Sequence, residues 1–457
     1  MSIGSGLWMM GHVEGISRDQ RQLLAPSLDE LVGAEHPVRV IDAFVDTLDV
    51  QGLSFARATA GEMGRPAYRP GDLLKLYIYG YMNQMRSSRR LEREAERNIE
   101  VQWLINRLAP SFKTIADFRR DHSAAILGVT RAFMRFCQGQ ALYGGALVAI
   151  DGTRIEAVAS RKKLLTPKGL AKRLAALDTK IAAYLGEMDV ADREEAVAAD
   201  GSAVAAALEV LKAQRDEVQA QAKALADEGL TQKVIGEPEA RLMKIARHGH
   251  QIAYNAQTAV DGKHGLIAAF DLTSDGNDFG QLQPMAERAK AGITAVVPRP
   301  GTVNPNGKDL FSRDAFTYDA ASDSWTCPAK ETLVLHQSSK AAQKKYYKTA
   351  ACAGCALKPQ CTRGEARAVV RHFCEDDRQA MHQRAVDDPS FMKRRRELAE
   401  HPFGHIKWLL GYPRFLLRGI EKARAELALA VIAFNLKRTI SILGVPALLQ
   451  ALRPATA

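Results

Sequence analysis

The sequence predicts a mixed α/β protein, in which a sheet-bearing core follows a helical domain and contains a helical insertion. Three observations predict this fold class. Apolar residues recur at helical spacing through residues 1–142, and strand-like runs appear at 145–160 and again from 249 onward. Between these two groups of strands, residues 161–230 are rich in Ala, Lys and Glu. Strands that resume after a long helical stretch are typical of a mixed sheet with an inserted helical segment.

The N-terminal helices are predicted from apolar spacing and from residues that begin helices. Pro70 suits a first helical turn, and either Ser111 or Thr114 can cap a later helix. With Arg and Lys on one side, such a helical segment could bind DNA, but an ordinary bundle with a solvated charged face explains it equally well. The first apolar face is formed by Val38, Ile41, Phe44, Val45 and Leu48.

The stretch "GALVAIDGTRIEAVAS" indicates a β-hairpin at residues 145–160. An apolar run from Leu147 to Ile150 is followed by Asp151-Gly152, a common turn pair, and then by a second short apolar run. This pattern places Asp151 at the end of a buried strand, where its side chain would reach the edge of the sheet.

The insertion at 161–230 is predicted to be an antiparallel coiled-coil hairpin of two helices. Leu residues keep a heptad-like rhythm on both sides of the interruption "GEMDVADREEAVAADGS". The residues in the rhythm are Leu170, Leu174, Leu177, Ile181 and Leu185 before it, and Leu208, Leu211, Val218 and Leu225 after it.

Strands return after the insertion and are followed by helices. "GHQIAYNAQTAVD" and "LIAAFDLTS" are strand-like, a helix with Asp278 as its cap follows, and "ITAVVP" is a further strand. The long apolar helix in "EKARAELALAVIAFNLKRTISIL" is suited to covering such a sheet.

Composition describes an ordinary globular chain with a basic balance. The 457 residues carry a formal net charge of +11, which favours a polyanionic partner without naming one. No run reaches the ~18 to 20 apolar residues that a membrane helix needs, and the first residues lack the pattern of a secretion signal. We therefore expect a cytoplasmic protein that does not contact membranes.

Asp151 and Glu400 form the first candidate site. Two carboxylates from separate elements that meet at a sheet edge are the oxygen ligands that Mg²⁺ requires, and such ions support phosphoryl transfer. The competing interpretations are a simple turn at Asp151 and an intrahelical ion pair between Arg396 and Glu400, four residues apart.

The second candidate is a basic surface near the C-terminus. Residues 390–440 contain eleven Lys or Arg and four Glu, a net charge of +7. Aromatic residues alternate with cations in "HPFGHIKWLLGYPRF", which favours a surface that contacts DNA over a solvated helix face. The candidate contacts are Arg394, Arg395, Arg396, Lys407, Arg414 and Arg418.

The third candidate is a group of cysteines. Cys327 is followed by Cys352, Cys355 and Cys361, and this CxxC with two further cysteines is compatible with a tetrahedral zinc site. Four thiolates would leave no open position, so a zinc ion here would be structural. Cys374 is a rival ligand, and the alternative is a loosely ordered module without metal.

Several segments in consistent order resemble bacterial insertion-sequence transposases of the DDE type. They are "AIDGTRIEA", "IAYNAQTAVDGKHGLIAAFDLTSDGNDFGQLQPM", the cysteine-bearing stretch, and "RRRELAEHPFGHIKWLLGYPRFLLRGIEKARAELALAVIAFNLKR". The resemblance implies a ribonuclease H-like core, preceded by a helical domain that binds the ends of the element. It also implies two Asp and one Glu that hold Mg²⁺ or Mn²⁺ for DNA cleavage and strand transfer, with a homodimer on double-stranded DNA.

Carried over by position, the resemblance makes Asp151 the first acid and Glu400 the third. The family's C-terminal signature of Tyr, Arg, Glu and Lys is matched by Arg396, Glu400 and Lys407, whereas Lys393 stands where Tyr is usual.

The second acid has no counterpart in this chain. In the family an apolar strand ending in Ala-Asp, and then a helix, lie between the segments that match "GQLQPM" and "AGITAVVPRP". Here "MAERAKAGITAVVPRP" runs directly from one to the other, without the ~10 to 12 residues that a strand and a helix need. The nearby acids match turn and capping residues of the family instead: Asp261, Asp271, Asp275 and Asp278.

We therefore expect a DNA transposase with an internal deletion that impairs catalysis, or alternatively a non-catalytic DNA-binding relic that occupies element ends. The expected domains are a helical DNA-end-binding domain at 1–142, the core at 143–160, 231–312 and 376–457, the coiled coil at 161–230 and the cysteine module at 313–375.

Overall fold

The N-terminal helices pack around α3 and confirm the helical prediction for this region. The computed structural model describes residues 26–59, 66–193, 201–245, 248–278, 280–289, 296, 309–340, 343–409, 411 and 414–453. The helices are α1 (Leu28–Leu31), α2 (Pro37–Asp46), α3 (Pro70–Met82), α4 (Ser88–Arg97), α5 (Ile99–Leu104), α6 (Phe112–Asp121) and α7 (Ser123–Gly139).

Capping side chains set where these helices begin. Pro70 opens α3, and the Ser111 side chain accepts the Thr114 N–H, so Ser111 is the cap of α6. The stretch after Ser87 divides into α4 and α5 because Asn98 ends one helix and caps the next.

The central sheet is antiparallel and is built around the long strand β5 (Gly249–Asp261). One edge of β5 pairs with β1 (Val148–Glu156), and the other pairs with β4 (Arg241–Ile245) and β6 (Ile267–Thr273). The mixed helix-and-sheet class is confirmed, as are the two strands expected from 249 to 273. The strand expected at 293–298 lies outside the described residues, apart from Val296.

The predicted hairpin at 145–160 is wrong. β1 continues straight through Asp151-Gly152, with Gly152 opposite Gln257 of β5. The pair forms no turn because both of its residues are held in the ladder. Asp151 therefore lies in the middle of a strand rather than at its end.

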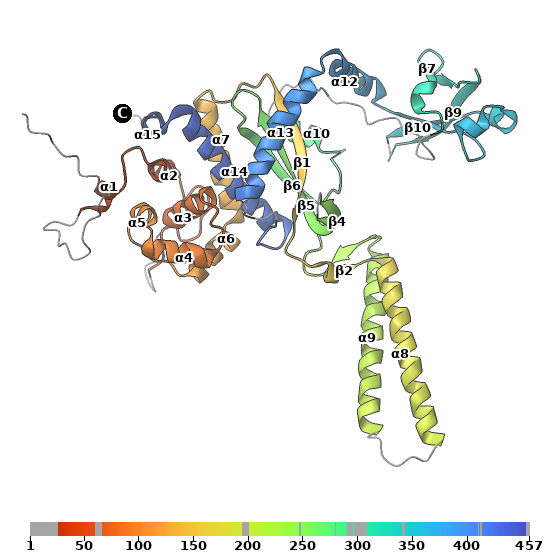
Figure 1. Cartoon of the computed structure of the whole chain (residues 1–457), viewed down its shortest axis with the longest axis horizontal. Coiled ribbons are helices and arrows are strands. Elements are labelled where there is room, and N and C mark those ends of the chain that lie inside the picture. Colours follow the sequence, from red (N-terminus) through yellow and green to blue (C-terminus); the bar gives the residue numbers. More distant parts are fainter. Residues whose placement is uncertain are drawn as a thin grey trace, which may run out of the picture.

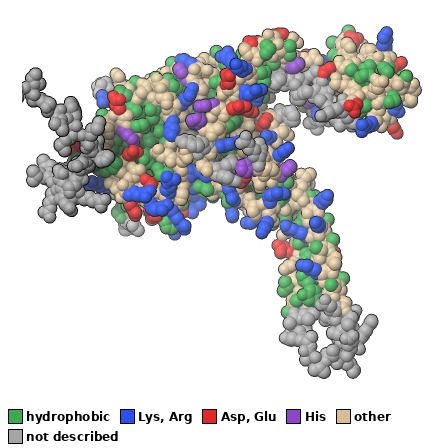
Figure 2. Space-filling model, in the orientation of Figure 1, with side chains coloured by type: hydrophobic (Ala, Val, Ile, Leu, Met, Phe, Trp, Pro, Cys, Tyr) green, Lys and Arg blue, Asp and Glu red, His purple; other side chains and the backbone are tan. Residues whose placement is uncertain are grey.

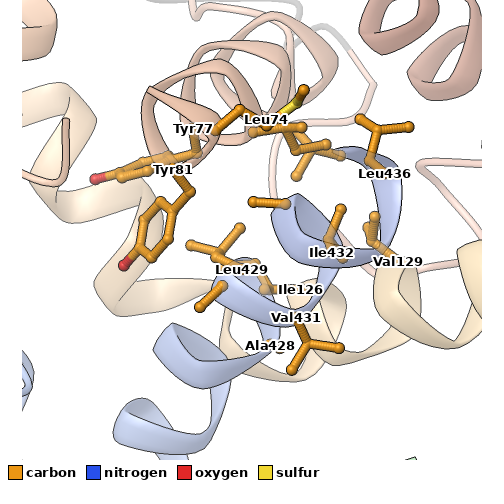
Figure 3. Close-up of a cluster of buried hydrophobic side chains, with 14 of the residues drawn as sticks. Leu74, Tyr77, Tyr81, Ile126, Val129, Ala428, Leu429, Val431, Ile432 and Leu436 are labelled. Atoms are coloured by element: carbon orange, nitrogen blue, oxygen red, sulfur yellow. The ribbon is translucent and has the colours of Figure 1, made fainter. Parts of the chain in front are cut away.

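Helix α14 (Ile420–Leu443) lies between the N-terminal helices and the sheet, and it is buried along most of its length. It packs against α3, α7 and β6, so one continuous apolar core joins all three (Figure 1). Figure 3 shows Leu429 and Ile432 of α14 beside Leu74, Tyr77 and Tyr81 of α3 and Ile126 of α7. The prediction that this helix covers the sheet is confirmed. The short helix α15 (Val445–Leu452) turns back onto α2.

Glu426 and Asn435 of α14 are fully buried and bonded across elements. Glu426 lies 3.1 Å from the Arg86 guanidinium and accepts the backbone N–H groups of Leu416 and Leu417. The Asn435 amide bonds both backbone groups of Ile267 at the start of β6, as a neighbouring strand would. These bonds fix both the rotation and the axial position of α14.

Two long helices project from the sheet as a hairpin (Figure 1). They are α8 (Pro167–Arg193) and α9 (Gly201–Asp227), joined to the sheet by the short pair β2 (Leu164–Leu165) and β3 (Lys233–Val234). Leu170 and Leu225 are buried at the root, whereas Leu185 is 45% exposed farther out. The helical hairpin matches the predicted insertion, and its supercoiling stays a prediction.

A second, smaller sheet holds the cysteine-rich segment. Its strands are β7 (Thr317–Asp319), β8 (Ser324–Thr326), β9 (Thr332–Ser339), β10 (Lys344–Lys348) and β11 (Val369–His372). They lie side by side in the order β11-β10-β9-β8-β7. Helix α11 (Lys358–Cys361) lies between β10 and β11. Helices α12 (Glu375–Asp387) and α13 (Ser390–Leu409) then lead back to the central sheet (Figure 1).

Asp278 does not cap a helix, contrary to the prediction. The N-cap of α10 (Leu282–Arg288) is Gln281. The Asp278 carboxylate instead accepts hydrogen bonds from Asn255 and Gln257 of β5.

Among the described residues, no single helix is long and apolar enough to cross a membrane. Helices α14 and α15 meet the requirement only as a pair bent by 110°.

The Glu426→Gln substitution should lower the free energy of unfolding by about 3 kcal/mol, because it leaves the Arg86 charge without its buried counter-ion. Urea unfolding followed by circular dichroism would measure this loss. Glu421→Gln, which alters a 70% exposed partner of Arg424 on the same helix, should cost less than about 0.5 kcal/mol. Equal effects of the two substitutions would contradict the role given to Glu426.

Candidate metal and DNA site

The Asp151 carboxylate lies at the outer edge of β1. Its Oδ1 accepts the Gly152 N–H at 3.0 Å and a hydrogen bond from Arg395 Nη2 at 3.1 Å. The same Nη2 also donates to the Ile150 carbonyl at 3.2 Å. This carbonyl and the Gly152 N–H point away from β5, toward the position where a further strand would pair. Arg395 and Asp151 thus occupy the hydrogen-bonding groups of a strand edge.

The outer edge of β1 has one further contact within the described residues. At its end, Glu156 forms a parallel bridge with Arg414, and the Phe415 N–H donates to the Glu156 carbonyl at 2.8 Å. The described chain supplies no complete strand along this edge.

Helix α13 carries Arg395 and Glu400, and it packs along β1 and β5. Ala399 and Ile406 are fully buried, so they and Arg395 mark the side of the helix that faces the sheet. Glu400 lies five residues beyond Arg395, about 140° around the helix, and is exposed. The structure therefore brings the strand of Asp151 and the helix of Glu400 together.

A polar cluster lies on the opposite face of the sheet, against Gly152, with buried Asn255 and Gln257 side chains and an exposed Asp278. Asp278 Oδ1 accepts hydrogen bonds from Asn255 Nδ2 at 2.7 Å and from Gln257 Nε2 at 2.6 Å. A Cβ on Gly152 would stand 2.1 Å from Gln257 Nε2 and 2.4 Å from Asp278 Oδ1. Gly152 thus makes room for this cluster, which is why Asp-Gly occurs inside a strand.

Sequence reasoning missed this cluster, although a signal for it exists. Asn255 and Gln257 are two residues apart in a strand that also contains several apolar residues, so they share one face.

A divalent cation is implied by the predicted Asp151 and Glu400 pair. Mg²⁺ takes oxygen ligands, and both residues can supply one. However, the described residues include no group of three or more His, Cys, Asp or Glu that could hold a metal ion. The Arg395 guanidinium also bonds one of the two Asp151 carboxylate oxygens, Oδ1. In this arrangement the residues do not fit a complete catalytic metal site.

The six predicted DNA contacts have different surroundings. Arg394, Arg396 and Arg418 are exposed and available to a polyanion. Arg395 is bonded to Asp151, and the Arg414 guanidinium donates to the Val158 carbonyl at 2.7 Å.

Lys407, the remaining predicted contact, is half-buried, and burial lowers the pKa of its amine. Figure 2 shows further Lys and Arg side chains spread over the central body and the root of the helical hairpin.

The four predicted zinc ligands come together although they derive from two separate loops. Cys327, Cys352, Cys355 and Cys361 line one cavity of the small sheet, while Cys374 is exposed next to α12. None of the six cysteines forms a disulfide.

Two segments of the chain match known family models. Residues 26–121 match the model described as a transposase domain (DUF772), and residues 326–440 match the model described as a transposase DDE domain. No curated protein and no solved structure gave a match. The second segment includes Glu400 and the four cavity cysteines, whereas Asp151 lies between the two matched segments.

The Gly152→Ala substitution should destabilise the protein by about 1 to 3 kcal/mol, because the added methyl group overlaps Gln257 and Asp278. Gly186→Ala is the matched control, because Gly186 is an exposed residue of α8 with open space around it. This substitution should raise the free energy of unfolding by up to about 1 kcal/mol. Chemical denaturation of both variants measures the difference. An unchanged stability for Gly152→Ala would show that the cluster is not packed against β1.

Proposed function

Because this chain belongs to the insertion-sequence transposases of the DDE type, we propose that it binds the ends of its DNA element and that its strand-cutting activity is impaired. The observation that carries this proposal is the packing of α13, with Glu400 and the basic run, along the strand that bears Asp151. Those elements hold two of the three acids that the family uses, beside cations that can contact phosphate.

The proposed core is ribonuclease H-like. The antiparallel order of β1, β5 and β6, with α13 and α14 packed on the sheet, supports this arrangement. In such a core the second acid of the family would follow another strand, and the unpaired outer edge of β1 offers a place where that strand could pair.

An internal deletion is supported by the end of α10. This helix stops at Arg288, and the predicted strand begins at residue 293, so a further strand and helix cannot fit between them.

Nearby acids do not supply a substitute in the described arrangement. Asp261 accepts the N–H groups of Gly144, Gly145 and Lys263, and Asp271 forms ion pairs with Arg288 and Arg424. Asp275 accepts a hydrogen bond from Gln281, and Asp278 bonds the two amides of β5. Each of these carboxylates has a local structural partner, and none belongs to a group of three or more described His, Cys, Asp or Glu that could hold Mg²⁺ or Mn²⁺.

The alternative is a DNA-binding relic that no longer cuts. The ion pair between Arg395 and Asp151 favours it, because a guanidinium stands where a metal ion would bind the first acid. The pair is partly exposed, with Arg395 at 40% and Asp151 at 31%, so it contributes at most about 1 kcal/mol and a phosphate or a metal ion could displace it. Residual activity is therefore a question for experiment.

Strand cleavage of a labelled duplex that carries the element's ends tests the impairment. In Mg²⁺ and in Mn²⁺, we expect the wild-type chain to bind the duplex but to cut it no faster than Asp151→Ala or Glu400→Ala. Binding is measured in parallel for all three proteins. Wild-type cutting that both substitutions abolish would mean that another residue supplies the third ligand.

The salt dependence of DNA binding tests the basic surface. Each phosphate contact adds about 0.9 to the slope of log affinity against log salt concentration. Arg394→Gln and Arg396→Gln should each lower that slope by about 1 and weaken binding to all sequences alike. Lys212 lies on the outer hairpin, where it pairs with Glu209. The control Lys212→Gln should therefore leave the slope unchanged. Equal slopes for all variants would exclude Arg394 and Arg396 as DNA contacts.

A further inference from the structure

The small sheet has too little apolar core to account for its order. Its buried cluster among the described residues consists of Phe316, Trp325, Leu333, Tyr347 and Val369. Val334 and Leu335 on the same sheet are 60% and 44% exposed. Modules of this size usually need a disulfide or a metal ion in addition to such a core, and no disulfide is present.

Four cysteines meet at one end of this sheet. Cys327 follows β8 directly, Cys352 and Cys355 lie in and after the turn that follows β10, and Cys361 ends α11. They line a cavity of about 20 Å³, which is room for roughly one water-sized sphere. No Asp, Glu or His lines this cavity, so its potential ligands are thiols.

The turn at Cys327 is shaped around the sulfur atom. The Glu331 N–H donates to Cys327 Sγ at 3.3 Å, and the Lys330 N–H donates to the Cys327 carbonyl at 2.8 Å. Lys330 adopts a φ of 64°, which a β-branched residue would rarely tolerate, and this conformation closes the turn. A backbone N–H directed at sulfur stabilises the thiolate form that binds metals.

The four thiols are close enough to influence one another electrostatically. Burial raises the pKa of Cys361, the Arg367 guanidinium opposes this shift, and the charges of Cys352, Cys327 and Cys355 raise the pKa further.

We propose that Cys327, Cys352, Cys355 and Cys361 together bind one Zn²⁺ ion that stabilises the small sheet. A site of four thiolates leaves zinc no open position, so its role is structural. In the described conformation no three of these residues are already arranged to hold a metal ion. Binding therefore requires the thiols to turn into the cavity that they line, which couples metal uptake to the folding of the two loops.

Zinc content of the full-length chain tests the proposal. Protein purified with reductant, supplied with Zn²⁺ and then dialysed should retain about one zinc per chain by atomic emission. Cys361→Ser and Cys352→Ser should each lose most of this zinc. Cys374→Ser, which removes an exposed cysteine outside the cavity, should retain all of it. Absence of zinc from the wild type, or equal zinc in Cys361→Ser and Cys374→Ser, would overturn the proposal.

A titration of the wild-type chain with Co²⁺ guards against variants that simply unfold. Tetrahedral binding by four thiolates should give intense sulfur-to-cobalt charge-transfer and d–d absorption at one equivalent, and Zn²⁺ should abolish both. Thiol counting on metal-free protein, denatured without reductant, tests whether the cysteines form disulfides instead. Fewer than six reactive thiols per chain would indicate disulfides in place of the metal site and would contradict the proposal.

Discussion

The burial of α14 is the constraint on which the rest of the structure depends. A helix that is enclosed on nearly every side must bond its polar groups to the elements around it. Glu426 therefore bonds Arg86 and the backbone of 416–417, and Asn435 bonds the first residue of β6. The N-terminal helices and the central sheet consequently share one core, although they are widely separated in sequence. The same packing supports α13, which also contacts α14, and so sets where the basic run lies relative to β1.

The outer edge of β1 links this architecture to function. An unpaired strand edge exposes hydrogen-bonding groups that proteins usually cover. Here Arg395 and the Asp151 carboxylate cover the middle of the edge, and the segment beginning at Arg414 covers its end. Arg395 and a divalent ion would compete for Asp151 Oδ1. Our proposal of impaired cutting therefore rests on this competition as well as on the second acid that the family resemblance predicts to be missing.

The two projecting parts are stabilised in different ways. The helical hairpin is packed best at its root around Leu165, Leu170 and Leu225, and its helices are joined farther out by the Arg215–Asp178 pair. The small sheet has a core of a few aromatic and aliphatic side chains, next to a cavity lined by thiols. Loss of the proposed zinc should thus loosen the small sheet, while the body around α14 keeps its own apolar core.

The sequence by itself determined the elements whose signals are local. Helical spacing predicted α2, Pro70 indicated the first turn of α3, and a long apolar stretch predicted α14. A cap at Ser111 or Thr114 indicated the start of α6, and the heptad-like rhythm predicted the hairpin of α8 and α9. The family resemblance, carried by motifs along the chain, was confirmed by the two matched segments. Only the tertiary structure decided that Asp151-Gly152 lies inside a strand, that Asp278 bonds two amides of β5, and that Arg395 reaches Asp151. These outcomes depend on which residue faces which neighbour across a sheet or between a helix and a strand. Such pairings are set by packing between residues far apart in the chain, and that information is absent from any short stretch of sequence.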